Sequence, residues 1–177
     1  QQPRDYWQAA VSSTIGALPL ASIAAETVFR RGGDCDRLRA LVDELDACHR
    51  WFASLRDPSG WSCVTVSHRA EGLLPDTAGY LAGFAGMSDD DVVDAIADDA
   101  FGPGPVAVYD PLSTSVLAVA EDALARLSAG LGSVHPEAVG RAKAIRKGLR
   151  YNLYDVARGR YRYVGAHGGT AECPEVL

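Results

Sequence analysis

Three arginines and one tyrosine recur at intervals of four near the end of the chain. They are Arg146, Arg150, Tyr154 and Arg158. Residues four apart share one face of a helix, so this spacing would place the four side chains in a row. Guanidinium groups bind carboxylate or phosphate through paired hydrogen bonds, and a tyrosine hydroxyl adds another donor. We therefore predict that these residues bind an anionic or aromatic small molecule.

Cysteine and histidine side chains form a second group within residues 48–68. Its members are Cys48, His49, Cys63 and His68. Histidine exchanges protons near neutral pH, so His49 or His68 is predicted to act as a general acid or base. Cys63, paired with either imidazole, would supply a thiolate nucleophile. The predicted catalytic residues are therefore His49, His68 and Cys63.

The same group leaves a zinc site as an open alternative. Zinc would require all four side chains to converge, and their spacing matches no standard finger, ribbon or knuckle. Cys48 also falls on the apolar stripe of its expected helix, where a buried free thiol is common. We therefore predict core packing for Cys48 and no bound metal, and the sequence identifies no cofactor.

Charge is divided unevenly along the chain. Residues 71–122 contain 11 acidic side chains and no basic one, whereas residues 126–163 contain nine basic and two acidic side chains. The simplest interpretation is that neighbouring helices present these charges to solvent and pair in part, each exposed pair adding little stability. The alternative is a non-catalytic interaction or regulatory module that docks proteins through acidic residues 89–99 and the basic last helix.

Within the acidic segment, Asp90, Asp91 and Asp94 follow the pattern DDxxD. The run resembles the magnesium-binding signature of class I isoprenoid synthases, in which carboxylates one turn apart hold metal ions against a diphosphate. It also follows Ser88 in the first turn of an expected helix, where the helix dipole favours acids without any metal. The helix start is the simpler interpretation, and the family is not assigned.

Apolar residues recur at helical spacing through most of the chain, and glycine or proline separates the segments. We predict one domain of about six helices over residues 1–164 and a loose tail over residues 165–177. Helix-capping residues followed by helix formers mark the clearest starts, at Asp34, Asp110-Pro111 and His135-Pro136. The last long helix is predicted to extend to Val156.

One run alternates as a strand does, over residues 61–68. Residues 160–164 are the expected partner for residues 63–66. The predicted fold class is therefore mainly α, a single-domain helical bundle with at most a short two-stranded ribbon.

Composition limits the classes of partner. The net charge of −6 and a pI near 5.1 argue against general nucleic-acid binding. The uncharged residues 6–25 include polar side chains and proline, which predicts a buried core helix and no membrane span. Four cysteines without a C-x-x-C pair favour reduced thiols in the cytoplasm. Fifteen arginines against two lysines indicate GC-rich coding and a bacterial source.

Motifs of the common nucleotide-binding and hydrolase folds are missing from the sequence, among them G-x-G-x-x-G, Walker A and G-x-S-x-G. We predict a small all-helical enzyme or binding protein for an anionic or aromatic small molecule in bacterial specialised metabolism. The interaction module remains the alternative. A small-molecule ligand is the favoured partner, nucleic acid and membrane are disfavoured, and a homo-oligomer stays open.

Overall fold

The computed structural model describes residues 18–66, 107–165 and 170–171. Four α-helices make up most of these residues: α2 (Ala21–Arg30), α3 (Cys35–Leu55), α6 (Pro111–Gly130) and α7 (Pro136–Gly148). A π-helical turn, η2 (Leu149–Leu153), continues α7. The described part is mainly α-helical, as the sequence predicts, and the count of about six helices stays a prediction.

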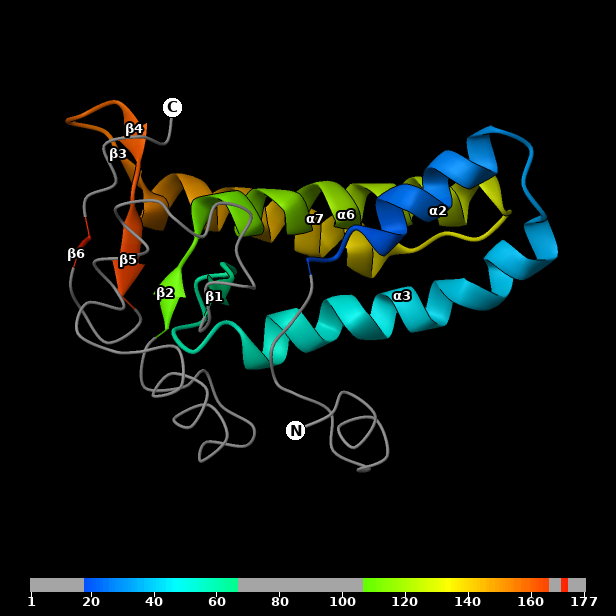
Figure 1. Ribbon diagram of the computed structural model, residues 1–177, viewed down its shortest axis with the longest axis horizontal. Coiled ribbons are helices and arrows are strands. Elements are labelled where there is room, and N and C mark those ends of the chain that lie inside the picture. Colours follow the sequence, from blue (N-terminus) through cyan, green and yellow to red (C-terminus); the bar gives the residue numbers. More distant parts are fainter. Residues whose placement is uncertain (1–17, 67–106, 166–169, 172–177) are drawn as a thin grey trace, which may run out of the picture.

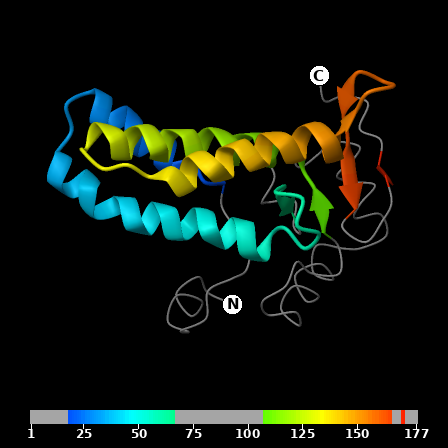
Figure 2. The same ribbon diagram turned by 180° about the vertical axis from the view of Figure 1, so that it is seen from behind.

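Helix α6 organises the bundle, because it contacts α2, α3 and α7. Figures 1 and 2 show α6 and α7 side by side along the length of the molecule, with α3 running alongside this pair. Helix α2 rests on α6 near the end far from the strands (Figure 1). None of the helices that the structure describes is both long and apolar enough to cross a membrane.

The three marked helix starts are confirmed, because each has a side chain that satisfies free backbone N–H groups of the first turn. The carboxylates of Asp34 and Asp110 each accept hydrogen bonds from two such N–H groups, at the starts of α3 and α6. His135 accepts one from the N–H of Ala138 at 3.4 Å, at the start of α7. Such caps contribute about 0.5–2 kcal/mol each, which is why local sequence predicts these boundaries well.

Two apolar clusters fill the interior. Residues of the first lie on all four α-helices: Ala25, Leu38, Leu45, Leu124, Leu127, Leu131 and Ala138. The second lies toward the strands and contains Phe52, Cys63, Val64, Tyr109, Leu117, Ala118, Ile145, Leu149, Leu153 and Val164. Leu124 and Leu127 are fully buried, and each such side chain stabilises the fold by about 1.5–3 kcal/mol relative to its exposed state.

The prediction of at most a two-stranded ribbon was wrong, because the described strands form one four-stranded and one two-stranded sheet. An antiparallel sheet has the order β1 (Thr65–Val66), β2 (Val108–Tyr109), β5 (Tyr163–Gly165) and β6 (Thr170–Ala171). Strand β2 lies between β1 and β5, so residues 63–66 do not pair directly with residues 160–164 as expected. Strands of two or three residues are too short to show an alternating pattern in the sequence.

The last helix also ends earlier than predicted. Helix α7 stops at Gly148, η2 stops at Leu153, and the chain then forms a hairpin of β3 (Tyr154–Asp155) and β4 (Arg160–Tyr161). The Asp155 carboxylate accepts hydrogen bonds from the N–H groups of Ala157 and Arg158, and Gly159 takes a φ of +67°. This side-chain turn competes with the helix, so Val156 lies exposed in a loop.

Several expectations fall on residues outside the described ranges. These are His68, the acidic residues 89–99, and the helix start at Ser88. Within the predicted tail, Gly165 belongs to β5, and Thr170–Ala171 form β6 against it.

Candidate functional site

A cluster of buried charges joins three helices inside the bundle. Glu121 on α6 is fully buried and accepts two hydrogen bonds from Arg141 on α7, from Nε at 2.6 Å and from Nη2 at 2.9 Å. Nη2 of Arg141 also donates to Oδ1 of Asp46 on α3 at 2.5 Å. A buried charge is tolerated only when it is paired, so this cluster fixes α3, α6 and α7 relative to one another.

The electrostatics of Arg141 show how the cluster is balanced. Burial alone would lower the pKa of its guanidinium, but the hydrogen bonds with Glu121 and Asp46 outweigh burial and raise that pKa above its ordinary value. Arg50, at the surface, gives Asp46 a further partner, with Nη1 2.7 Å from Oδ2. Arg141 therefore stays charged, and its two carboxylate partners hold it in place.

His49, a predicted catalytic residue, belongs to this cluster and is only 1% exposed. Its Nε2 lies 2.9 Å from Oγ of Ser22 on α2. Its Nδ1 lies 3.1 Å from Oε2 of Glu121, at ion-pair distance but outside hydrogen-bonding geometry. The imidazole is thus enclosed by protein groups, which suits a bridge between α2, α3 and α6 better than proton exchange with a ligand.

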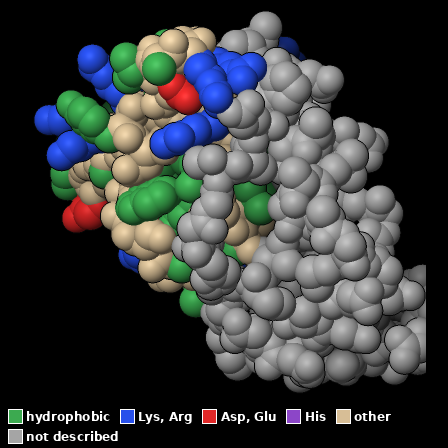
Figure 3. Space-filling model, turned by 90° about the vertical axis from the view of Figure 1, so that its left-hand side faces the viewer, with side chains coloured by type: hydrophobic (Ala, Val, Ile, Leu, Met, Phe, Trp, Pro, Cys, Tyr) green, Lys and Arg blue, Asp and Glu red, His purple; other side chains and the backbone are tan. Residues whose placement is uncertain are grey.

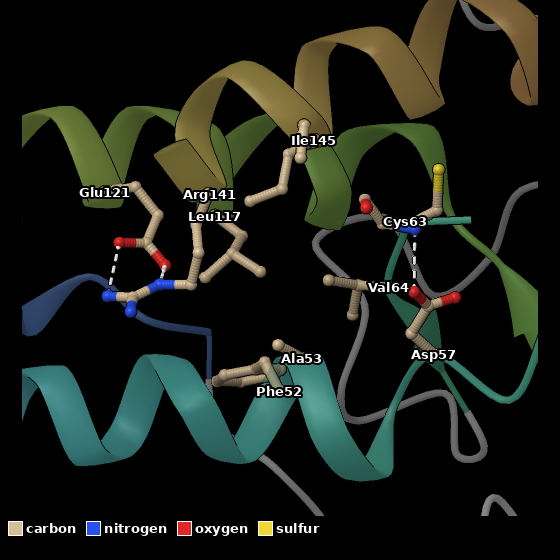
Figure 4. Close-up of a pocket in the computed structure, with 11 residues that line it drawn as sticks. Phe52, Ala53, Asp57, Cys63, Val64, Leu117, Glu121, Arg141 and Ile145 are labelled. Atoms are coloured by element: carbon tan, nitrogen blue, oxygen red, sulfur yellow. Dashed lines mark hydrogen bonds and ion pairs between the residues drawn. The ribbon is translucent and has the colours of Figure 1, made fainter. Parts of the chain in front are cut away.

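Beside the charged cluster lies a cavity of about 130 Å³. Glu121 and Arg141 stand at one end of it and Asp57 at the other, while Phe52, Val64, Leu117 and Ile145 line its walls between those ends (Figure 4). The carboxylates of Glu121 and Asp57 thus lie at opposite ends of one mainly apolar cavity.

Asp57 organises the loop that follows α3. Its carboxylate accepts hydrogen bonds from the backbone N–H groups of Trp61 at 2.9 Å and Ser62 at 2.7 Å. The hydroxyl of Tyr109 donates to it at 3.1 Å, and the N–H of Ser59 donates to that hydroxyl at 2.8 Å. Asp57 is therefore the acceptor that shapes this loop.

The predicted nucleophile Cys63 is buried in the same cavity wall. Burial, with a smaller contribution from the charge of Asp57, raises the pKa of its thiol to about 12. The thiol is protonated at neutral pH, the opposite of what a thiolate nucleophile requires.

The prediction that Cys48 packs in the core was wrong. Cys48 is exposed, and the neighbouring His49 faces the core instead. Partial burial of its sulfur raises the pKa of the Cys48 thiol. In the part of the chain that the structure describes, no three metal-ligating side chains come together. His68, the fourth member of the predicted group, lies outside that part.

A second, open hollow lies where α7 passes into η2. This groove has a volume of about 390 Å³, and its lining residues are Gly60, Trp61, Ser62, Ala144, Lys147, Gly148, Tyr151 and Asn152. Figure 3 looks at the strand-bearing end of the molecule, where apolar side chains gather beside lysine and arginine side chains. The residues that line the groove thus include two aromatic residues, an asparagine and a lysine.

Trp61 is held firmly in the groove wall. Its ring stacks on that of the fully buried Tyr109, with centroids 4.8 Å apart and an interplanar angle of 22°. The amide of Asn152 lies 3.5 Å from the Trp61 carbonyl oxygen, a long hydrogen bond. Next to it, Ser62 takes a φ of 56°, in the left-handed region that residues other than glycine rarely adopt. The groove wall thus contains a fixed ring and a strained backbone.

The four predicted ligand-binding residues do not share one face. Arg146 on α7 pairs with Asp122 on α6, and Arg150 is exposed on η2. Tyr154 packs edge-to-face against Tyr161 across the hairpin, with ring centroids 5.1 Å apart. Arg158 lies in the hairpin turn, and none of the four lines either hollow.

The expected attraction between the acidic and basic segments is seen across α6 and α7. Glu121 and Asp122 belong to the acidic segment, and they pair with Arg141 and Arg146 of the basic one. Two of the bases offered by the predicted docking surface are therefore engaged within the molecule.

Sequence reasoning missed the buried cluster and most of the groove. Lys147 and Tyr151 have the same spacing of four as the predicted row, displaced by one residue. That spacing was the available signal, but nothing local distinguishes one helical face from the next when both are polar. Trp61 is far away in sequence, and its position beside Gly148 follows only from tertiary packing.

Comparison with known proteins places the chain in one family, with a match over nearly its full length. Residues 2–175 match the family described as the mannosylglycerate hydrolase MGH1-like glycoside hydrolase domain. No curated protein matches the sequence.

Three solved structures illustrate the likeness of fold, all from Thermus thermophilus. The GH63 mannosylglycerate hydrolase in complex with glucose has a TM-score of 0.78 at 21% identity, covering 96% of this chain and 48% of that one. The same hydrolase with Tris and D-glycerate gives 0.78 at 20% identity, covering 97% and 52%. An uncharacterized conserved protein gives 0.77 at 21%, covering 91% and 46%. The chain therefore spans about half the length of these similar structures.

Proposed function

Because the chain belongs to the family of MGH1-like glycoside hydrolase domains, we propose that it hydrolyses a glycosidic bond in a small sugar conjugate. The observation that carries this proposal is the extent of the family match, which runs over residues 2–175 and includes every described element. The open groove supports it, since its volume falls within the range of roughly 300–1,000 Å³ typical of small-molecule sites.

The similar solved structures suggest which conjugates to test first. One of them is a mannosylglycerate hydrolase, seen in complex with glucose and in complex with Tris and D-glycerate. We take a sugar joined to a small hydroxy acid as the first substrate class. Such a conjugate would be the anionic ligand predicted from the sequence, with its carboxylate as the charged group.

Glycoside hydrolysis uses two carboxyl groups, one as general acid and the other as base or nucleophile. Asp57 and Glu121 line one cavity, but the first shapes a loop and the second is held by Arg141. The reacting pair is therefore sought among acidic residues outside the described ranges, such as Glu71 and Asp76. His68 remains a predicted acid or base.

The test measures sugar release by the purified chain. Mannosylglycerate, a glucose conjugate of glycerate and neutral methyl mannoside are incubated separately, and the freed sugar is quantified by chromatography. We expect release from at least one glycerate conjugate and none after heat denaturation. Conjugates that stay intact in the presence of chain that circular dichroism shows to be helical would contradict the proposal.

Carboxamide substitution of each acidic residue outside the described ranges then locates the reacting groups. Removing a general acid or base lowers the rate by roughly 10²- to 10⁴-fold, while a bystander changes it little. Asp155→Asn is the matched control, because this carboxylate caps a hairpin turn and lines neither hollow.

A further inference from the structure

The groove at the end of α7 has the composition of a carbohydrate subsite. We infer that it binds an anionic sugar, with Trp61 and Tyr151 against the sugar ring and Lys147 opposite the anionic group. That the anion is carried by a sugar rests on the proposed function. The position and the charge of the site rest on described residues alone.

The aromatic side chains suit the faces of a sugar ring, whose C–H groups are apolar while its edge is polar. Trp61 is already ordered by stacking on Tyr109, so binding on it costs little conformational entropy. Tyr151 is 69% exposed, although its ring is one of the larger apolar surfaces on the described part of the chain. An amphipathic ring left open beside a fixed one is a ready contact for such a ligand.

Lys147 supplies a positive charge that no carboxylate neutralises within the described ranges. The arginines on either side of it in α7 and η2 differ, since Arg146 pairs with Asp122 while Arg150 does not line the groove. An exposed ammonium beside an open groove attracts an anion of one charge without demanding the planar geometry that a guanidinium favours. Charge therefore points to an anionic group on the ligand.

Two further features give the groove polar contacts of fixed direction. Asn152 is half-buried, its amide nitrogen lies 3.5 Å from the Trp61 carbonyl oxygen, and its own carbonyl oxygen is an acceptor that a hydroxyl could use. Ser62 is held in the left-handed region by the bond from its N–H to Asp57. Backbone strain that the surroundings enforce clusters at active sites, ligand clamps and switch regions.

Direct binding of three small probes tests the inference. Glucuronic acid, glucose 6-phosphate and glucose are titrated into the full chain at low ionic strength, and heat is measured by calorimetry. We expect both anions to bind more tightly than glucose. Whichever anion binds more tightly identifies carboxylate or phosphate as the preferred group, and either order supports an anionic sugar.

Matched variants assign the binding to the groove. Lys147→Met should weaken both anions about tenfold and leave glucose unchanged, the loss expected for one charge-assisted hydrogen bond. Lys143→Met, on the same helix but outside the groove lining, should change none of the three. Tyr151→Ser should weaken all three, and because Tyr151 is exposed this change should leave the melting temperature near that of the unmodified chain.

Three results would overturn the inference: no probe binds, the anions bind no better than glucose, or the two lysine variants behave alike. The failure of the hydrolase proposal would look different. Probe binding that depends on Lys147, without sugar release from any conjugate, would retain the subsite and reject hydrolysis. Sugar release that is indifferent to both Lys147→Met and Tyr151→Ser would reject the subsite alone.

Discussion

Gly148 of α7 lies directly against the backbone of Trp61. A β-carbon at this position would stand 2.1 Å from the Trp61 carbonyl oxygen and 2.9 Å from Sγ of Cys63, closer than atoms in real structures come. The contact brings the helix onto the loop after α3 and so forms one side of the groove. A glycine inside a helix costs about 1 kcal/mol relative to alanine, and here the close approach explains it.

Gly148→Ala should therefore destabilise the protein, by about 1–3 kcal/mol, because the loop must shift to make room. The variant should also lose affinity for sugar probes. Gly140→Ala is the control on the same helix, where nothing lies within 4 Å of the added carbon. That variant should gain roughly 0.5–1 kcal/mol from helix propensity. Urea unfolding measures both, and equal effects would argue against the packing described.

Arg141→Met should cost about 3–5 kcal/mol in the free energy of unfolding, because it leaves the buried carboxylates of Glu121 and Asp46 without their shared partner. Arg146→Met provides the comparison. Its partner Asp122 is partly exposed, so the loss should stay within about 1 kcal/mol. Chemical denaturation of the two variants side by side distinguishes them, and similar losses would show that the buried cluster adds no special stability.

Glu26 should make stability depend on pH in the acid range. Arg126 donates two hydrogen bonds to the Glu26 carboxylate, which lower its pKa. Burial acts in the opposite direction, and a third hydrogen bond, from Arg30, lowers the pKa further. The pKa of Glu26 therefore falls below its ordinary value of 4.5. A lowered folded-state pKa contributes stability above the unfolded pKa, and that stability disappears as the pH falls through the folded value. The unfolding free energies of the unmodified chain and Glu26→Gln should therefore converge as the pH falls below the unfolded value of 4.5 and through the lower folded value. A difference that is constant with pH would contradict this assignment.

Cys63 should resist alkylation in the folded protein. Its buried thiol has a pKa of about 12, so at pH 8 almost no thiolate is present. Exposed Cys35 should react with iodoacetamide under the same conditions, and peptide mass spectrometry separates the two. Unfolding in guanidinium should make the two cysteines react alike. Rapid native labelling of Cys63 would instead contradict the raised pKa and reopen its predicted role as a nucleophile.

Local signals predicted the helix starts because each depends on residues within one turn. Asp110 beside Pro111 is enough to begin α6 wherever the helix lies in the fold. Which side chains of α3 point into the core depends on partners that are distant in the sequence. Hydrophobicity favours Cys48 in the core over His49, yet the imidazole faces inward because Glu121 and Ser22 meet it there. No pattern within α3 contains that information.

The groove could not be predicted from the sequence for a related reason. Its two aromatic walls, Trp61 and Tyr151, come from segments 90 positions apart and meet only once α7 packs on the loop after α3. The prediction that the three arginines and Tyr154 share one face was wrong, because it required one continuous helix. A turn formed by the Asp155 side chain ends that helix, and Tyr154 packs against Tyr161 instead of joining the row.

The π-helical turn η2 has a consequence for how this chain tolerates change in length. A π-helical turn contains more residues than an α-helical one, as if a single residue had been inserted into α7 without breaking it. Removing one residue between Leu149 and Leu153 would let the segment close as ordinary α-helix, but it would rotate everything that follows about the axis. The hairpin and β5 would then leave their partners. Homologous chains that differ in length should therefore keep this turn intact and vary in the loops on either side.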